Sequence, residues 1–426
     1  MAQGSKNTFA NKQERIIAAL DVGTTKICCF IAKIGADNSI NILGTGYRIS
    51  EGVKGGSVVD MEATEASIRA AVDQAERIAN KTVDEVIVSL TGGKPLSHIV
   101  DMEIEIKGHE VNQSDIDRVL KQASAQIDPG ERQIIHAFPA CFSIDGSPPV
   151  RDPISMFGER LAVAMHVIDA FPGPMRNLEA CVQRAHLHAA RMVLSPYASG
   201  LATLVDDEKM LGAACVDIGG GATSISVFAK NAMVHAEVIQ TGGDTITEAI
   251  ARELLTPLHE AERLKIFYGS AVATQTDGQE TIDVPQLGEA EKTFDEENRV
   301  PKSYLTGLIQ PRIEKILLSV RSRLQEIGFD SESGRQVVLT GGVSLLPGIQ
   351  DLAQRVLGKK VRIGKPRGIN GLADAMSGPA FSACAGLLVY ASRAPRELGE
   401  HRLIKTIENN DKSLAGSISN WLKGNF

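Results

Sequence analysis

Aromatic side chains are scarce in this chain: they make up 4% of its 426 residues, and Trp421 is the single tryptophan. The chain is instead rich in glycine, with 40 residues, and 43% of it is hydrophobic. This composition disfavours a β-sandwich and favours an α/β protein built from small and aliphatic residues. A chain of this length can bury at least two hydrophobic cores.

Further absences exclude several classes of protein. The six cysteines, including the adjacent pair Cys28 and Cys29, show neither metal-ligand spacing nor a disulfide framework, which indicates a reducing compartment. No apolar run approaches the roughly 18 residues of a transmembrane helix, and the first residues lack the apolar core of a signal peptide. The net charge of −7 and the lack of a long basic stripe argue against nucleic acid as a partner. We therefore expect a cytosolic protein.

Two stretches of the chain share one pattern. Residues 15–34, RIIAALDVGTTKICCFIAKI, predict two apolar strands joined by a tight turn. Residues 211–230, LGAACVDIGGGATSISVFAK, repeat the order of apolar strand, aspartate, glycine turn and apolar strand. This degenerate internal repeat predicts two similar domains that face one another.

The residues from about Lys94 to Arg160 differ from their surroundings. They predict short alternating strands, one polar helix near Gln113–Gln126, and proline-rich turns. The apolar run LAVAMHVI at 161–168 returns to the pattern of a core strand. We therefore expect a small α+β unit inserted into the first domain, with the core of that domain resuming near residue 163.

Three glycine-rich turns each follow an apolar strand, at 21–26, 217–223 and 339–348. Glycine lets backbone N–H groups approach an anion without a Cβ in the way. Together with two aspartates at strand ends, the three turns predict a site for a polyphosphate. TGGK at 91–94 lacks the full spacing of a phosphate loop and is not counted among them.

The side chains beside these turns fit the same chemistry. Hydroxyl groups of Thr24 and Thr25 in the first turn and of Thr223 after the second add donors, and the Thr24 turn ends in Lys26, whose charge a polyphosphate needs. Asp21 and Asp217 would repel phosphate directly, but each can hold a hydrated Mg²⁺.

The order and spacing of the three turns resemble the two phosphate motifs and the adenosine motif of the actin-like ATPase superfamily. The resemblance implies an α/β, ribonuclease H-like duplicated fold with two lobes and Mg²⁺-ATP in the cleft between them. TGGD at 241–244 resembles the turn between the two subdomains of the second lobe, and EAERLK resembles a Glu-x-x-Lys motif that contacts ribose and adenine. A solvated i,i+3 ion pair is the alternative for that motif. The implied cofactor-binding residues are Asp21, Gly23, Thr24, Thr25, Lys26, Asp217, Gly219, Gly220, Gly221, Thr223, Gly242, Gly243, Glu262, Lys265, Gly341 and Gly342.

One position departs from the superfamily pattern. Hydrolytic members carry a Glu in a Glu-Pro-x-Ala stretch, or a similar Gln, that orients the attacking water. The matching stretch here is SPYASGLA, with Ser195 in place of that residue. Because serine cannot act as a comparable base near neutral pH, we expect ATP binding with slow or negligible hydrolysis.

The end of the sequence predicts an amphipathic helix from about Ser413. No acidic residue follows Asp411. The helix could dock on the protein's own core, or lie in the interface of an anionic membrane with its tryptophan at headgroup level. The polar linker before it favours the membrane. The residues assigned to this contact are Leu414, Ile418, Trp421, Leu422, Lys423 and Phe426.

An actin-like body with a terminal amphipathic helix is similar to the FtsA family of bacterial cell-division proteins. The resemblance implies self-assembly into filaments, binding of the FtsZ C-terminal tail, recruitment of later division proteins, and a location on the cytoplasmic face of the inner membrane at the septum. Arg312, in the Pro-Arg step of LIQPRIEKILL, is the residue implied in the FtsZ contact, with a solvated helix charge as the alternative. A sugar- or acetate-kinase-like phosphotransferase and a pilus-assembly adaptor on the same fold stay open as other functions.

The resemblance also implies a division of the chain into segments. The first lobe takes 13–85 and 163–206, the inserted subdomain 86–162, the second lobe core 207–241 and 309–380, the small subdomain of the second lobe 242–308, a return helix to the first lobe 381–395, a linker 396–411 and the membrane-targeting helix 412–426.

Overall fold

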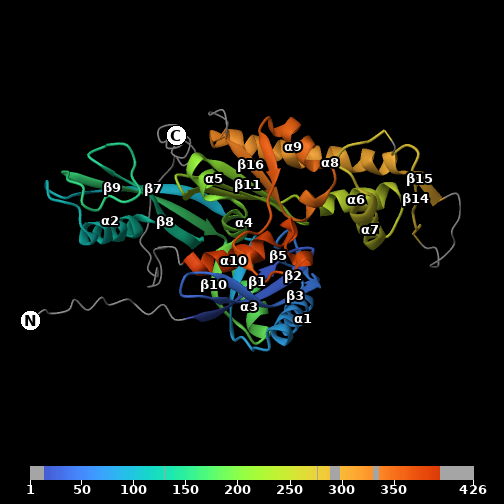
Figure 1. Ribbon diagram of the computed structural model, residues 1–426, viewed down its shortest axis with the longest axis horizontal. Helices are drawn as coiled ribbons and strands as arrows, with labels where there is room; N and C mark the ends of the chain where they lie inside the picture. Colours follow the sequence, from blue (N-terminus) through green and yellow to red (C-terminus); the bar gives the residue numbers. More distant parts are fainter. Residues whose placement is uncertain (1–13, 129, 276, 288–297, 330–334, 394–426) are drawn as a thin grey trace, which may run out of the picture.

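The computed structural model describes residues 14–128, 130–275, 277–287, 298–329 and 335–393. Two β-sheets form the centres of two lobes, and the order of strands is β10-β6-β1-β2-β3-β18 in the first and β13-β12-β11-β16-β17 in the second (Figure 1). The strands of the first sheet are β1 (Arg15–Val22), β2 (Lys26–Ile34), β3 (Ile40–Ile49), β6 (Glu85–Leu90), β10 (His188–Leu194) and β18 (Ile369–Asn370). Those of the second are β11 (Ala213–Ile218), β12 (Thr223–Ala229), β13 (Ala232–Ile239), β16 (Gln336–Thr340) and β17 (Lys360–Ile363).

The two sheets repeat one topology. In the first, β1 pairs with β2 antiparallel and with β6 parallel. In the second, β11 pairs with β12 antiparallel and with β16 parallel. The internal repeat predicted from the sequence is therefore confirmed, and the fold is the expected mixed α/β type with two related lobes.

Helices cover the sheets of both lobes. Those of the first lobe and its junction with the second are α1 (Met61–Ala79), α3 (Pro172–Arg184), α4 (Ser195–Thr203), α5 (Asp206–Leu211) and α10 (Ser382–Arg393). Those of the second lobe are α6 (Asp244–Glu253), α7 (Leu258–Tyr268), α8 (Lys302–Glu326) and α9 (Ile349–Leu357). No helix in the described part of the chain is long and apolar enough to span a bilayer.

Helix α1 illustrates how local sequence sets an element. The side chain of Asp60 caps its first turn by accepting hydrogen bonds from the N–H groups of Glu62 and Ala63, both at 3.0 Å. Asn80 ends it in the left-handed region, at φ 48°. Its apolar face packs on β2 and β3, but Ile78, which the periodicity assigns to that face, is 57% exposed because it lies in the last turn.

Helices α4 and α10 cross between the lobes and pack against each other. The crossing is close because glycine stands at the contact: a Cβ built on Gly386 would lie 2.8 Å from the Cα of Ala198 and nearer still to its carbonyl group. α10 also packs on β1 and β2, while α4 packs on β11 and β12, so the pair joins the two sheets.

The inserted subdomain is a three-stranded sheet in the order β7-β9-β8, covered by α2 (Gln113–Gln126). Its strands are β7 (Leu96–Glu105), β8 (Gln133–Ile144) and β9 (Arg160–Ala170). It lies at one end of the molecule, and α6, α7 and the short hairpin β14–β15 lie at the other (Figure 1). In that hairpin, β14 (Thr281–Asp283) pairs antiparallel with β15 (Arg299–Pro301).

Both expected boundaries of the inserted subdomain, 86 and 162, need correction. Strand β6 belongs to the first-lobe sheet, and the run LAVAMHVI lies in β9, the central strand of the inserted sheet, rather than in the first-lobe core. β9 has α2 on one side and β13 on the other, so it is buried on both faces and has the apolar run of a core strand. The chain also reaches the first lobe again before residue 381, because β18 pairs with β3.

Candidate functional site

A cavity of about 340 Å³ lies between the lobes. It is lined by all the residues implied in cofactor binding except Thr223 and Gly242. The predicted residues that line it are Asp21, Gly23, Thr24, Thr25, Lys26, Asp217, Gly219, Gly220, Gly221, Gly243, Glu262, Lys265, Gly341 and Gly342. Residues from five separate stretches of the sequence thus meet at one place.

The first two glycine turns form matching hairpins. The N–H of Gly23 donates to the carbonyl of Lys26 at 3.0 Å, and the N–H of Gly219 donates to the carbonyl of Ala222 at the same distance. The tips of the two hairpins face each other: a Cβ on Gly221 would lie 2.5 Å from the Thr24 hydroxyl oxygen. Glycine is therefore required at this tip by close approach, as well as by access to its backbone N–H.

Asp21 and Asp217 occupy equivalent places, next to the last residues of β1 and β11, and both point into the cavity. The Asp21 carboxylate accepts a hydrogen bond from the Ser89 hydroxyl at 2.6 Å, and Asp217 accepts one from the Ser199 hydroxyl at 2.5 Å. Burial raises the pKa of both; for Asp217 it does so to about 6, with the charge of Asp21 adding to the shift. Two neighbouring carboxylates whose charged forms are destabilised by burial are suited to a cation.

No group of three or more histidine, cysteine or acidic side chains gathers around a metal-sized space in the described ranges. Asp21 and Asp217 offer carboxylate oxygens of the kind that a hydrated Mg²⁺ accepts, because Mg²⁺ keeps several waters and takes few carboxylates.

Lys26 lies at the wall of the cavity. Its ammonium group donates to the carbonyl of Ala380 and lies 4.5 Å from the centre of the Phe381 ring. Ala222 takes the place of Lys26 in the second hairpin, so the two turns differ in charge. A polyphosphate in the cavity would therefore meet a lysine at the first hairpin but not at the second.

The TGGD turn supports the second hairpin from behind. The N–H groups of Gly243 and Asp244 donate to the carbonyls of Gly219 and Gly220, at 2.9 and 2.8 Å. A Cβ on Gly242 would lie 2.6 Å from the carbonyl oxygen of Gly219, so Gly242 packs against the hairpin and does not line the cavity. Gly242 thus supports the site without lining the cavity.

Thr223 is the other predicted residue that does not line the cavity. It is fully buried, and its hydroxyl donates to the carbonyl of Thr241 at 2.7 Å. That bond ties the start of β12 to the TGGD turn. The sequence correctly places a hydroxyl beside the turn, but the pleat of β12 directs it away from the cavity.

Glu262 and Lys265 are not a solvated pair. The Lys265 ammonium is buried, with 7% of the residue exposed, and lies 2.6 Å from the Glu262 carboxylate and 2.8 Å from the Thr247 hydroxyl. Both residues line the cavity from α7. An ion pair whose ammonium group is buried and hydrogen-bonded is held in one geometry, so it can present fixed polar groups to a ligand.

An apolar wall stands beside this ion pair. It is formed after β16, where Gly341 takes φ 85°, a conformation that favours glycine. The side chains of this wall are Ile266, Val343, Leu345, Leu346 and Pro347. They combine an apolar surface with a few fixed polar groups, as ligand pockets commonly do. The sequence indicated the turn but not these side chains, because ordinary apolar residues carry no motif.

Ser195 and Thr91 form a further part of the lining. Ser195 starts α4, is buried, and lies 2.6 Å from the Thr91 hydroxyl oxygen. The TGGK segment, which lacks the spacing of a phosphate loop, still contributes Thr91 to the lining of the cavity. The tetrapeptide LTGG occurs both at 90–93 and at 339–342, and this repetition could have identified Thr91.

Arg312 lies on α8, directly after Pro311, which is inside the helix. It is half-buried and is not among the residues that line the cavity. The linker and the residues assigned to membrane contact, from Leu414 to Phe426, lie outside the described residues.

Two family profiles match the chain. "Cell division protein FtsA" matches residues 214–386, and "SHS2 domain inserted in FTSA" matches residues 92–169, which agrees with the extent of the β7-β9-β8 sheet. The matched range of the second profile leaves out β6 and includes β9 up to residue 169, as the sheet pairing does.

Proteins and solved structures of known identity are also similar. "Cell division protein FtsA" of Rhizobium meliloti is 40% identical, over 98% of this chain and 96% of the relative. Proteins of the same name from Agrobacterium fabrum and Escherichia coli K12 are 41% and 29% identical, over 98% and 97% of this chain and 96% and 98% of the relatives.

Among solved structures, a PilM–PilN type IV pilus biogenesis complex matches with a TM-score of 0.62 at 17% identity, over 88% of this chain and 98% of the other. MreB5 of Spiroplasma citri bound to ADP matches with a TM-score of 0.54 at 12% identity, over 89% and 97%. These two likenesses confirm the actin-like fold. Near-complete matches at 40% identity, and an inserted sheet at the place that the family profile describes, identify more than a fold: the chain belongs to the FtsA family of cell-division proteins.

Proposed function

We propose that this FtsA-family protein binds Mg²⁺-ATP in the cavity between its lobes. The observation that carries the proposal is the pair of facing glycine hairpins, each with an aspartate beside it at the end of the preceding strand. Backbone N–H groups at the hairpin tips and the hydroxyls of Thr24 and Thr25 suit phosphate oxygens. Asp21 and Asp217 suit the hydrated Mg²⁺ that would neutralise the phosphates.

The other wall suits a nucleoside. The fixed ion pair of Glu262 and Lys265 offers an acceptor and a donor, and Val343 and Leu346 offer an apolar surface. A nucleobase has both a flat apolar face and hydrogen-bonding edges, so such a surface fits it. The MreB5 relative is described as bound to ADP, and this likeness of fold agrees with the proposal.

Hydrolysis is expected to be slow. Ser195 and Thr91 offer hydroxyl groups where a hydrolytic enzyme needs a carboxylate or amide to orient water. We propose that ATP acts mainly as a bound ligand that holds the lobes together. Its release and rebinding would then control assembly of the protein more than its turnover does.

The cellular role follows from the family. We propose that the protein assembles into filaments, binds the C-terminal tail of FtsZ through the small subdomain of its second lobe with Arg312 in the contact, and recruits later division proteins. Membrane attachment at the septum would come from the segment 412–426, with Trp421 in the interface. A single such anchor binds weakly, so a filament that presents several would gain strongly from effective concentration.

Substituting Gly221 tests nucleotide binding. Gly221→Val should weaken binding of Mg²⁺-ATP by about 100-fold, or about 2.7 kcal/mol, because its Cβ would lie 2.5 Å from the Thr24 hydroxyl and 2.8 Å from the Gly55 nitrogen. Gly278→Val is the matched control, since Gly278 is exposed and nothing lies within 4 Å of its Cβ position. Calorimetric titration measures the affinity, and phosphate release from the same samples should be on the order of 10⁻³ s⁻¹ or slower.

Either of two results would contradict the proposal. The first is a wild-type protein without measurable affinity for Mg²⁺-ATP. The second is an unchanged affinity in the Gly221 variant. Rapid transfer of phosphate from ATP to acetate or a sugar would instead favour the phosphotransferase.

A single charge on either face of the terminal helix tests the membrane contact. Trp421→Glu should reduce flotation with phosphatidylglycerol vesicles by about 10-fold or more, because it removes one apolar side chain worth about 1.5–3 kcal/mol when buried. Asn420→Glu adds the same charge opposite the apolar stripe and should reduce flotation far less. Equal flotation of the two variants would count against an amphipathic anchor.

A further inference from the structure

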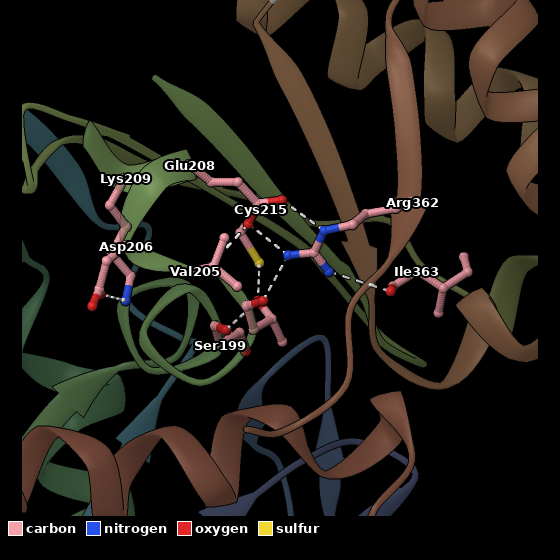
Figure 2. Close-up of polar contacts among 9 residues, drawn as sticks. Ser199, Val205, Asp206, Glu208, Lys209, Cys215, Arg362 and Ile363 are labelled. Carbon is pink, nitrogen blue, oxygen red and sulfur yellow. Dashed lines mark hydrogen bonds and ion pairs between the residues drawn. The ribbon is translucent and has the colours of Figure 1, made fainter. Parts of the chain in front are cut away.

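An arginine on the edge of the second lobe makes a two-pronged ion pair with a glutamate near the junction of the lobes. Arg362, on β17, donates from Nε and Nη2 to the two carboxylate oxygens of Glu208, both at 2.6 Å (Figure 2). The two side chains are 22% and 12% exposed. Such paired hydrogen bonds fix the plane of the guanidinium group, which a lysine could not do.

The ion pair holds the connection between α4 and α5. Arg362 Nη2 also donates to the carbonyl of Thr203, the last residue of α4, at 2.8 Å. Glu208 Oε2 accepts from the N–H of Val205 at 2.9 Å, at the start of α5. The last carbonyls of a helix lack partners within it, and a cation placed there is favourable. Arg362 and Glu208 thus fix where α4 ends.

Hydrogen bonds connect the end of α4 to an aspartate of the cavity. The Thr203 hydroxyl donates to the carbonyl of Ser199 at 2.7 Å, and the Ser199 hydroxyl donates to Asp217 Oδ2 at 2.5 Å. Figure 2 shows Arg362, Ser199 and Cys215 gathered around this end of the helix. The contacts form one series, from Arg362 through Thr203 and Ser199 to Asp217.

We propose that Arg362, held by Glu208, is a positioning residue for Mg²⁺-nucleotide binding. The proposal rests on the function proposed above. Arg362 does not line the cavity; it fixes the end of α4, and α4 holds the hydroxyl of Ser199 against Asp217. Without this ion pair the end of α4 can move. Asp217 then loses the donor that orients its carboxylate toward the ion.

Conservative substitutions in the full chain test this proposal. Arg362→Lys keeps the charge but loses the paired bonds, and ATP affinity is measured with Mg²⁺ and with EDTA. We expect the gain in affinity that Mg²⁺ provides to fall about 10-fold, with affinity in EDTA unchanged within about twofold. Ser199→Ala should give the same pattern, and the double variant little further loss, because both substitutions interrupt one series of contacts.

Arg323→Lys is the matched control. Arg323 forms ion pairs with Glu237 at 3.2 Å and Glu326 at 2.8 Å, on β13 and α8, and not with a residue of the series from Arg362 to Asp217, so its replacement should leave the Mg²⁺ dependence unchanged. If Arg362→Lys does not fold, Glu208→Gln provides the same comparison, since glutamine can still accept from Val205. A lowered melting temperature with an unchanged Mg²⁺ dependence overturns the proposal. A wild-type protein that does not bind Mg²⁺-ATP overturns the proposed function itself, and this inference with it.

Discussion

Replacing Gly386 by alanine is expected to destabilise the protein by about 3 kcal/mol, although alanine is the better helix former. The added methyl group would overlap the carbonyl of Ala198, which belongs to the backbone of α4 and cannot rotate away. The two helices would have to separate, and α10 would lift from β1 and β2. Urea unfolding of the full chain measures the change.

Gly307→Ala is the matched control for this change. Gly307 also lies within a helix, α8, but it is exposed and nothing lies within 4 Å of its Cβ position. Alanine there should keep the wild-type stability or add up to about 1 kcal/mol. Similar midpoints for the two variants would mean that the crossing of α4 and α10 is looser than the structure indicates.

The second large effect concerns the histidines under the inserted subdomain. His166, on β9, is fully buried, and its ring lies edge-on to Phe138 at 5.2 Å. Burial lowers its pKa to about 3, and the charges of His235, His98 and His136 add to the shift. These neighbours come from β13, β7 and β8, so the cluster lies where the inserted sheet meets the second lobe.

The sign of the pH effect follows from this lowered pKa. Between about pH 3 and the ordinary histidine value near 6.5, the unfolded chain binds a proton at His166 that the folded chain does not. The protein therefore has its full free energy of unfolding, as far as His166 determines it, above about pH 6.5, and this free energy decreases as the pH falls. It falls by about 3 kcal/mol by pH 4.

His166→Gln should remove this part of the pH dependence, measured as the unfolding free energy in urea at pH 7.5, 5 and 4. His186→Asn is the control: His186 is exposed and takes φ 63°, which asparagine tolerates, so the variant should keep the wild-type slope. Parallel curves for wild type and His166→Gln would show that the buried ring carries no such penalty.

The parts of the fold that the sequence predicted are those determined by local pattern. The hairpins at 15–34 and 211–230 are contiguous, and their strands, aspartates and turns can be read directly from the chain. The helix at Gln113–Gln126 has the predicted bounds because Asn112 caps it, with Asp115 completing a capping box. Such features depend on neighbours in sequence.

The parts that the sequence missed depend on neighbours in space. Residues 161–168 have the same apolar run whichever sheet they join, so pairing with β7 and β8 could not be deduced. Glu262 and Lys265 have the spacing of a surface pair, and only the packing of α7 buries the lysine. Lone serines such as Ser89 and Ser199 carry no pattern, although each bonds an aspartate of the cavity.

The two hairpin tips differ in size, and this difference lets them approach each other closely. One tip carries Thr24 and Thr25, and the other carries Gly220 and Gly221 at the matching places. Two bulky tips would collide, and two bare tips would give up the hydroxyl groups. Two identical tips could not close in this way, so the two halves of the repeat are complementary here rather than equivalent.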